Sequence, residues 1–280
     1  MNSVFVKDEK QLNVKIQQIK KKGKENLHII SDFDNTLSKA YIDGKKVQSM
    51  IAQIRHLGYL GEEYTKKAYA LYDQYNPIEI DPTIPQEIKN EKMVEWWTTH
   101  IKIQAEYGLS KQVLDDVVQN STFKLRDKIK DFFEILNKNK IPILLFSAGA
   151  GYFIRGYLKK NNLEYNNISI ISNEYDFNVD GKVLGYKSKV IHTFNKGEIA
   201  VKDDPVYSKI LHKENIILLG DSLGDLDMSK GLEHKVKITI GFYNEKDEKH
   251  LELYKDKFDI VITGDGPMDY VNELLKNILE

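Results

Sequence analysis

The stretch that decides the fold is Leu27-His28-Ile29-Ile30-Ser31-Asp32-Phe33-Asp34-Asn35-Thr36-Leu37. Its first four residues form a largely apolar run without polar alternation, which is typical of a parallel strand buried on both faces. Asp32 and Asp34 follow directly, and ligands bind at the carboxyl ends of strands in a parallel sheet. We therefore expect both carboxylates at the mouth of a crevice in an α/β protein.

Further apolar runs of strand length recur along the chain, with helical spacing of three and four between them. This alternation predicts a doubly wound, mostly parallel sheet. A turn at Asp180-Gly181, between two short β patterns, predicts a separate hairpin. The further runs cover residues 141–146, 168–171, 216–219, 236–240 and 258–262.

Residues 41–122 break this alternation. They contain no convincing buried strand, but Tyr64, Ala68 and Leu71 have helical spacing, and Ser110 is suited to cap a later helix. An insertion of this length is too long for an ordinary loop. We predict a helical cap domain at 41–122, inserted into a catalytic core formed by 1–40 and 123–280.

The composition excludes several classes of protein. The 280 residues include 41 Lys and Arg against 42 Asp and Glu, which argues against a nucleic-acid polymer as partner. The absence of cysteine excludes disulfides, thiolate metal sites and a cysteine nucleophile. Residues 1–10 carry charges where a signal peptide needs apolar residues, and no apolar run is long enough to cross a membrane. We expect a cytoplasmic monomer without membrane contact.

A second acidic cluster follows another buried run. Ile216 to Leu219 lead into Gly220-Asp221-Ser222-Leu223-Gly224-Asp225, which brings Asp221 and Asp225 to the same sheet edge. A single Asp in such a place often only caps a helix. Two clusters of close carboxylates repel, however, and a divalent cation relieves that repulsion. Hard oxygen ligands of this kind favour Mg²⁺.

Two weaker signals would complete such a site. Ser147-Ala148-Gly149 follows a buried run and offers a hydroxyl and backbone N–H groups at a helix start. This arrangement binds phosphate, although such loops are also common helix entries. Lys196 could neutralise phosphoryl oxygens, although it is one of many lysines.

These stretches together resemble the haloacid-dehalogenase-type (HAD) phosphohydrolases, and more closely the cytosolic 5′-nucleotidase III (pyrimidine 5′-nucleotidase) family. The resemblance covers nearly the whole chain and implies a HAD-like Rossmannoid core. The aspartate motifs specify only the superfamily, whereas segments of the insertion and Phe194-Asn195-Lys196 point to the nucleotidase branch. The segments of the insertion are Ile78-Glu79-Ile80-Asp81-Pro82 and Met93-Val94-Glu95-Trp96-Trp97-Thr98.

The resemblance also implies roles for the acidic residues. Asp32 matches the nucleophile of the family, and Asp34 matches its general acid and base. The side chains of Asp32 and Asp221 and the backbone carbonyl of Asp34 match the Mg²⁺ ligands. Asp225 is then a supporting acidic residue.

The remaining matches concern the substrate. Ser147, Lys196 and the backbone of Ala148 match phosphate-binding positions, and Glu79 matches the residue that holds the nucleoside. His100 departs from the pattern, because it stands where the family has a base-contacting serine. It therefore bears on the choice of nucleobase, or it is an ordinary helix-surface histidine.

Two adjacent tryptophans lie in the same segment. Trp96 and Trp97 point about 100° apart on a helix, so we expect one of them in the core. Packing is the favoured interpretation for Trp97, with stacking on a base as the alternative.

The predicted reaction is Mg²⁺-dependent hydrolysis of a nucleoside 5′-monophosphate, with a pyrimidine as the expected base, through an aspartyl-phosphate intermediate. The alternative enzyme is another capped HAD phosphatase that acts on phosphoserine or a sugar phosphate. A calcium loop at 32–43 fails because its sixth position is not glycine. A phosphoacceptor receiver domain would need neither the insertion nor 280 residues.

Overall fold

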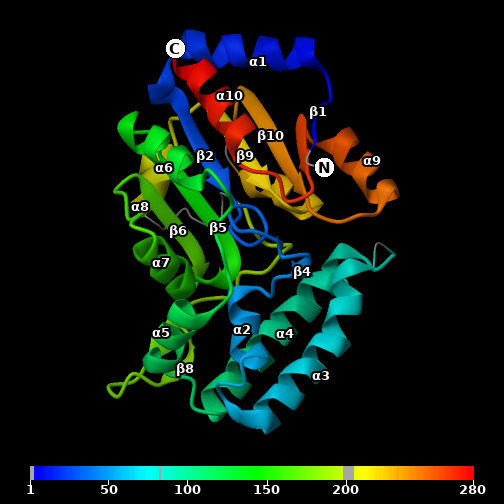
Figure 1. Cartoon of the computed structure of the whole chain (residues 1–280), viewed down its shortest axis with the longest axis vertical. Helices are drawn as coiled ribbons and strands as arrows, with labels where there is room; N and C mark the ends of the chain where they lie inside the picture. Colours follow the sequence, from blue (N-terminus) through cyan, green and yellow to red (C-terminus); the bar gives the residue numbers. More distant parts are fainter. Residues whose placement is uncertain (1–2, 82, 198–204, 232) are drawn as a thin grey trace.

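A seven-stranded sheet lies at the centre of the protein (Figure 1). The computed structural model describes residues 3–81, 83–197, 205–231 and 233–280, so Pro82 of the predicted motif lies outside the described residues. The strand order is β1-β11-β10-β9-β2-β5-β6, and all neighbours are parallel except β1 and β11. The strands are β1 (Val4–Val6), β2 (Leu27–Ser31), β5 (Ile143–Ala150), β6 (Ile168–Asn173), β9 (Asn215–Gly220), β10 (Val236–Tyr243) and β11 (Ile260–Thr263).

Alternate residues of the central strands pack into different cores on the two faces of the sheet. In β2, Ile29 joins a cluster with residues of α1 (Glu9–Lys22), α6 (Ile129–Lys138) and α10 (Asp269–Leu279). Its neighbour Ile30 joins a cluster with α8 (Pro205–Ile210) on the other face. Burial on both faces explains the continuous apolar runs. The predicted fold class, a doubly wound and mostly parallel sheet, is confirmed.

The edge strand β1 was not predicted. It has only three residues, and Val4 and Phe5 are exposed, so it carries no buried apolar run. It pairs antiparallel with β11, and Val4 lies opposite Ile262. Two further helices flank the sheet, α7 (Gly151–Lys160) and α9 (Glu248–Lys257).

The chain between β2 and β5 is mainly helical, as predicted. The helices α3 and α4 pack along each other beyond one end of the sheet (Figure 1). Ser110 caps α5 by accepting a hydrogen bond from the Val113 amide at 3.4 Å. The exact boundaries of a cap domain at 41 and 122 stay a prediction. The helices are α2 (Met50–His56), α3 (Gly61–Ile80), α4 (Gln86–Glu106) and α5 (Lys111–Asn120). They follow a short hairpin whose strands, β3 (Tyr41–Ile42) and β4 (Lys45–Lys46), have two residues each.

The hairpin predicted around Asp180-Gly181 is present. It consists of β7 (Tyr175–Phe177) and β8 (Val183–Tyr186), which pair antiparallel. β8 contacts α4, so this hairpin supports the helical insertion from the side of the core.

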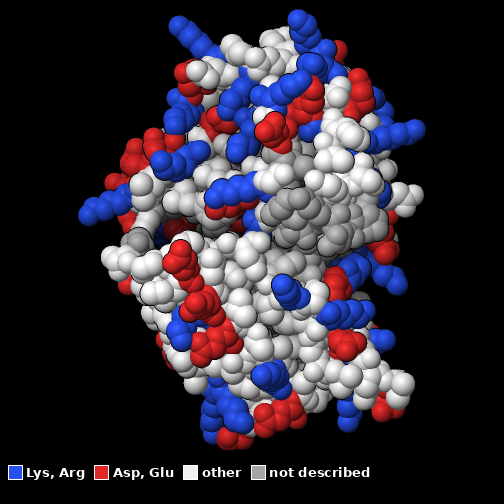
Figure 2. All heavy atoms as spheres, turned by 180° about the vertical axis from the view of Figure 1, so that it is seen from behind, with Lys and Arg blue, Asp and Glu red and all other residues white. Residues whose placement is uncertain are grey.

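The surface in Figure 2 shows basic and acidic side chains interspersed over the face turned away from the viewer in Figure 1. Among the described residues, no helix combines the length and the apolar character needed to cross a bilayer.

Candidate active site

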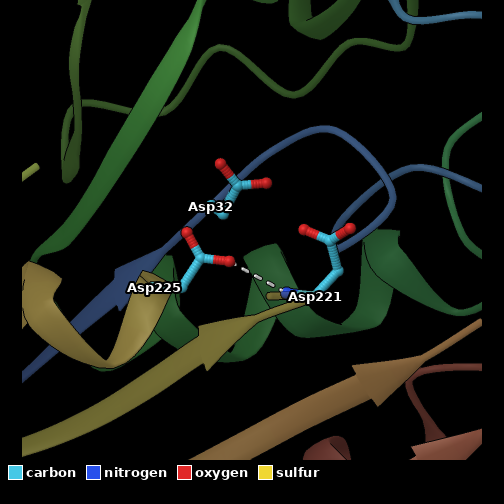
Figure 3. Close-up of side chains that lie close together, drawn as sticks. All are labelled: Asp32, Asp221 and Asp225. Carbon is cyan, nitrogen blue, oxygen red and sulfur yellow. Dashed lines mark hydrogen bonds between the residues drawn. The ribbon is translucent and has the colours of Figure 1, made fainter. Parts of the chain in front are cut away.

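Three carboxylates meet at the carboxyl edge of the sheet (Figure 3). Asp32 follows β2 and Asp221 follows β9, and these strands are parallel neighbours with Ser31 opposite Leu219. One oxygen each of Asp32, Asp221 and Asp225 lies within 4.8 Å of the others. The three carboxylates thus lie at the carboxyl ends of parallel strands, where the sequence predicted them. Their hard oxygen atoms fit a divalent cation such as Mg²⁺.

The environment of these carboxylates opposes their ionisation. Burial, followed by the charges of Asp32 and Asp225, raises the pKa of Asp221 well above its usual value. Burial also raises the pKa of Asp32 to about 7, although the ammonium of Lys196 acts in the opposite direction. A bound divalent cation would favour the ionised forms of both groups.

Asp225 is fully engaged by the protein itself. Its Oδ2 accepts hydrogen bonds from the Ser222 amide and hydroxyl, both at 2.9 Å, and from the Asp221 amide at 3.2 Å (Figure 3, dashed line). Its Oδ1 accepts a hydrogen bond from Lys196 at 3.2 Å. A Cβ on Gly220 would lie 2.4 Å from that of Asp225, so glycine allows this close approach. Asp225 thus holds the loop that carries Asp221.

Lys196 supplies a positive charge next to the carboxylates at this edge of the sheet. It is buried, and its ammonium donates to Asp32 Oδ1 as well as to Asp225. Burial alone would lower its pKa, but the carboxylates of Asp225 and Asp32 outweigh burial and raise it above the usual value. Lys196 therefore stays protonated beside Asp32.

The loop with Ser147, Ala148 and Gly149 differs from its prediction. These residues belong to the end of β5, where the register shifts between Phe146 and Ala150, and α7 begins only at Gly151. Pairing of Ala150 with Asn173 extends the strand through the expected helix start. Ser147 Oγ accepts a hydrogen bond from the Gly149 amide at 3.0 Å.

Asn173 holds this loop against the one that leads to Lys196. Its Nδ2 donates to the carbonyls of Ala148 at 2.6 Å and Ile191 at 2.8 Å, and its Oδ1 accepts from the Ile191 amide at 2.8 Å. Sequence reasoning missed this residue. Asn173 could have been found in the same way as the aspartates, because it follows the apolar run 168–171 and residues after such runs lie at the carboxyl edge of the sheet.

Asp34 lies on the loop after β2, opposite Gly149. A Cβ on Gly149 would lie 3.3 Å from Asp34 Oδ2. The other oxygen, Oδ1, is buried and has no hydrogen-bond partner among the described residues. Burial raises the pKa of Asp34 to about 6, against the opposing effects of Lys196 and a backbone hydrogen bond from Met50. Such a carboxyl group can carry a proton near neutral pH.

Arg126 fixes the backbone of that loop and was also missed by sequence reasoning. It is 1% exposed, donates from Nε to the Thr36 carbonyl at 2.7 Å, and pairs with Asp265 at 3.1 Å. No local pattern marks such a residue, because its partners lie far away in the sequence.

The helical insertion contributes Glu79 and His100. Glu79, in the last turn of α3, accepts a hydrogen bond from the Thr193 hydroxyl at 2.7 Å. His100 is 5% exposed and lies with Nε2 3.2 Å from the Tyr64 hydroxyl, so it is not a helix-surface histidine. Burial lowers the pKa of His100 to about 4, with a smaller contribution from Arg55.

One cavity connects the sheet edge with the insertion, and all the predicted site residues line it. Trp97 packs partly against the main core, as expected, and Trp96 stacks on Tyr75 with ring centroids 5.8 Å apart. Both indoles nevertheless reach the cavity. The predicted residues along it are Asp32, Asp34, Glu79, His100, Ser147, Ala148, Lys196, Asp221 and Asp225.

Comparison with known proteins gives this site a context. The family described as pyrimidine 5′-nucleotidase (UMPH-1) matches residues 35–279. The chain belongs to the pyrimidine 5′-nucleotidase family. This membership confirms the resemblance found in the sequence and shows that the chain is a 5′-nucleotidase, a phosphoric monoester hydrolase.

Individual members of the pyrimidine 5′-nucleotidase family differ in the substrates that their names give. A human relative named 7-methylguanosine phosphate-specific 5′-nucleotidase is 39% identical over 262 residues, 93% of this chain and 87% of that protein. A crystal structure of cytosolic 5′-nucleotidase IIIB bound to cytidine has a TM-score of 0.89 at 33% identity, covering 98% of this chain and 93% of that one.

A more distantly related solved structure has a similar fold. A HAD family hydrolase from Salmonella enterica has a TM-score of 0.60 at 17% identity, covering 90% of this chain and 71% of that one. At this identity the likeness concerns the fold alone. It agrees with the HAD-like Rossmannoid core expected of a pyrimidine 5′-nucleotidase.

Proposed function

We propose that the protein hydrolyses nucleoside 5′-monophosphates, with a pyrimidine as the preferred base, to nucleoside and phosphate through a phosphorylated Asp32. The observation that carries this proposal is the cavity itself. At one end, Asp32 lies beside Lys196 and the Ser147 loop. At the other end, the cavity is lined by Trp96 and Trp97, which offer flat aromatic surfaces suited to a base.

In the first step, Asp32 attacks the phosphorus atom while Asp34 gives its proton to the leaving 5′-oxygen, so that a neutral nucleoside departs. The raised pKa of Asp34, about 6, supports its role as the acid. Asp34, now ionised, then takes a proton from the water that hydrolyses the aspartyl-phosphate. Lys196 and the Ser147 hydroxyl hold the phosphoryl oxygens throughout.

Mg²⁺ is the proposed cofactor. The side chains of Asp32 and Asp221 and the carbonyl of Asp34 would hold it, and the raised pKa values of both carboxyl groups support this assignment. When bound, the ion neutralises negative charge on the phosphoryl group. Asp225 would act through Asp221 and Lys196, because its own oxygen atoms are already engaged.

The preference for pyrimidines rests on the family description and on the cytidine bound to the relative. The substrate named for the human relative, 7-methylguanosine phosphate, is the competing choice. We assign contact with the nucleoside to Glu79 and His100. A cytoplasmic location agrees with the cytosolic relative, and the monomeric state stays a prediction from the sequence.

The test is a phosphate-release panel with CMP, UMP, GMP, 7-methyl-GMP, glucose 6-phosphate and phosphoserine, each with Mg²⁺ or with excess EDTA. We expect the highest kcat/KM for a pyrimidine nucleotide and no turnover in EDTA. A higher kcat/KM for phosphoserine or the sugar phosphate would favour the alternative enzyme, and full activity in EDTA would refute the metal requirement.

A further inference from the structure

One buried cation at the helical end of the cavity forms no ion pair within the part of the chain that the structure describes. Arg55, in α2, is 8% exposed and lines the cavity together with His100. Its Nε is buried without a hydrogen bond, and its guanidinium forms no ion pair within the described residues. Its neighbours are the rings of Tyr69 and Tyr72, each centred 5.2 Å from the guanidinium carbon. Aromatic faces attract a cation, but they do not replace the hydrogen bonds that it loses on burial.

The two lysines along the cavity are both paired with carboxylates. Lys46 pairs with Glu245 at 2.8 Å, and Lys196 pairs with carboxylates of the sheet edge. Glu79 accepts the hydrogen bond from Thr193. A hydroxyl donor does not cancel the charge of a carboxylate, so Glu79 also contributes to the potential of the cavity. Among the described residues, Arg55 is the cation along the cavity that no carboxylate pairs with.

His100 adds a second donor at the same end. Gln104 Nε2 donates to the Tyr64 hydroxyl at 3.3 Å, which leaves the hydroxyl proton of Tyr64 for His100 Nε2. The ring of His100 is neutral near pH 7, because its pKa is lowered to about 4. Its single proton then resides on Nδ1. A ligand that completes the hydrogen bonds of Arg55 must offer acceptors, and the guanidinium would repel a positive charge on that ligand.

We propose that Arg55 is a specificity-determining residue, which donates hydrogen bonds to a carbonyl oxygen of a neutral nucleobase and excludes bases that carry a positive charge. This inference rests on the proposed function and names its substrate more closely. Uracil offers two carbonyl acceptors, and an arginine fork also matches O6 and N7 of guanine. In 7-methylguanine, N7 is blocked and the ring is cationic. The protein therefore prefers UMP and disfavours 7-methyl-GMP.

The experiment compares the full-length protein with Arg55→Gln, which removes the charge, and Arg55→Lys, which keeps the charge but loses the fork. For each protein, kcat/KM is measured for UMP, GMP and 7-methyl-GMP and is divided by that protein's own value for p-nitrophenyl phosphate. GMP and 7-methyl-GMP form a matched pair, since they differ only in the methyl group and its charge.

We expect the wild type to favour GMP over 7-methyl-GMP by roughly tenfold or more, by like-charge repulsion. Arg55→Gln should lose most of this discrimination, whereas Arg55→Lys should keep it and lose part of the preference for UMP. Thermal unfolding gives a second readout. Removing an unpaired buried charge should not lower the melting temperature of Arg55→Gln, whereas removing a structural contact would lower it.

Equal kcat/KM for GMP and 7-methyl-GMP in the wild type would overturn the inference. So would an unchanged ratio in Arg55→Gln. Failure of the proposed function would give a different result. In that case, the wild type would show no higher kcat/KM for any nucleotide than for glucose 6-phosphate or phosphoserine. That result would remove both proposals together.

Discussion

At the sheet edge, most buried charges are held by hydrogen bonds and ion pairs of the protein, whereas at the helical end of the cavity the buried Arg55 has no ion pair among the described residues. Asp225 accepts four hydrogen bonds from its own chain, and Arg126 holds the loop after β2. In contrast, Arg55 Nε is buried without a hydrogen bond among the described residues. The exception at the edge is Asp34 Oδ1.

This difference separates two tasks. Groups that carry out a reaction are most effective when they are fixed before the substrate arrives. Groups that select a substrate gain specificity when only the correct ligand completes their hydrogen bonds. The sheet edge fits the first task, the helical end fits the second, and Asp34 fits a group whose partner is the substrate.

The largest effect on turnover should come from replacing the proposed nucleophile at the sheet edge. Asp32→Asn should lower kcat by about 10⁴-fold or more, because the amide has nearly the same shape but cannot attack phosphorus. The measurement is phosphate release from the preferred nucleotide. Asp227→Asn, which changes an exposed carboxylate nearby, is the matched control. Substantial turnover by Asp32→Asn would contradict the assignment.

The next effect concerns the metal. We expect Mg²⁺ at about 100 times its Kd to stabilise the wild type by about 3 kcal/mol and to raise its melting temperature by several degrees. Asp221→Asn should remove this shift and lower kcat/KM by about 10³-fold. Without Mg²⁺ it should melt above the wild type, because the amide replaces a carboxyl group whose ionisation is opposed by burial and by Asp32 and Asp225. An equal Mg²⁺-induced shift in both proteins would exclude Asp221 as a ligand.

Glu79 tests the selective end of the cavity. Glu79→Gln should lower kcat/KM for nucleotides by roughly tenfold to hundredfold, because a neutral amide accepts weaker hydrogen bonds from the nucleoside. Rates are divided by the rate on p-nitrophenyl phosphate, which has no nucleoside. A parallel loss on both substrates would instead show that Glu79 supports the loop of Thr193 and Lys196.

The smallest effect on turnover should come from the buried histidines. Their titration should instead change the stability of the protein with pH. His100 and His192 both have pKa values lowered to about 4 by burial. Between pH 4 and 6.5 the unfolded chain binds protons that the native protein does not, so stability falls as the pH falls through this window. Each histidine accounts for about 3 kcal/mol at most.

The measurement is urea unfolding at pH 7 and at pH 4.5. His100→Gln should reduce the difference in unfolding free energy between these pH values, and His192→Gln should do the same in the loop that leads to Lys196. The double variant should be additive, since the two sites share no partner in the described structure. An unchanged pH dependence in His100→Gln would show that His100 can be protonated in the native state.

The sequence predicted those features that follow from local patterns. Asp32 and Asp221 were placed by apolar runs that end in acidic residues, and Ser110 by its capping position. Asn173 was missed although it follows an apolar run, whereas Arg126 was missed because its role depends on a loop that only the folded chain brings to it. Arg55 was missed for the same reason, since a helical pattern does not show that a charged side chain is turned inward.

The position of β2 has a consequence for synthesis of the protein. This strand is made early, yet one of its two neighbours in the sheet is β9, with Leu27 opposite Asn215. A nascent chain that has not reached β9 leaves one edge of this fully buried strand unpaired, and unpaired edges recruit other chains. Partial chains that end before β9 should therefore aggregate, and the ribosome must finish most of the protein before the central strand is protected.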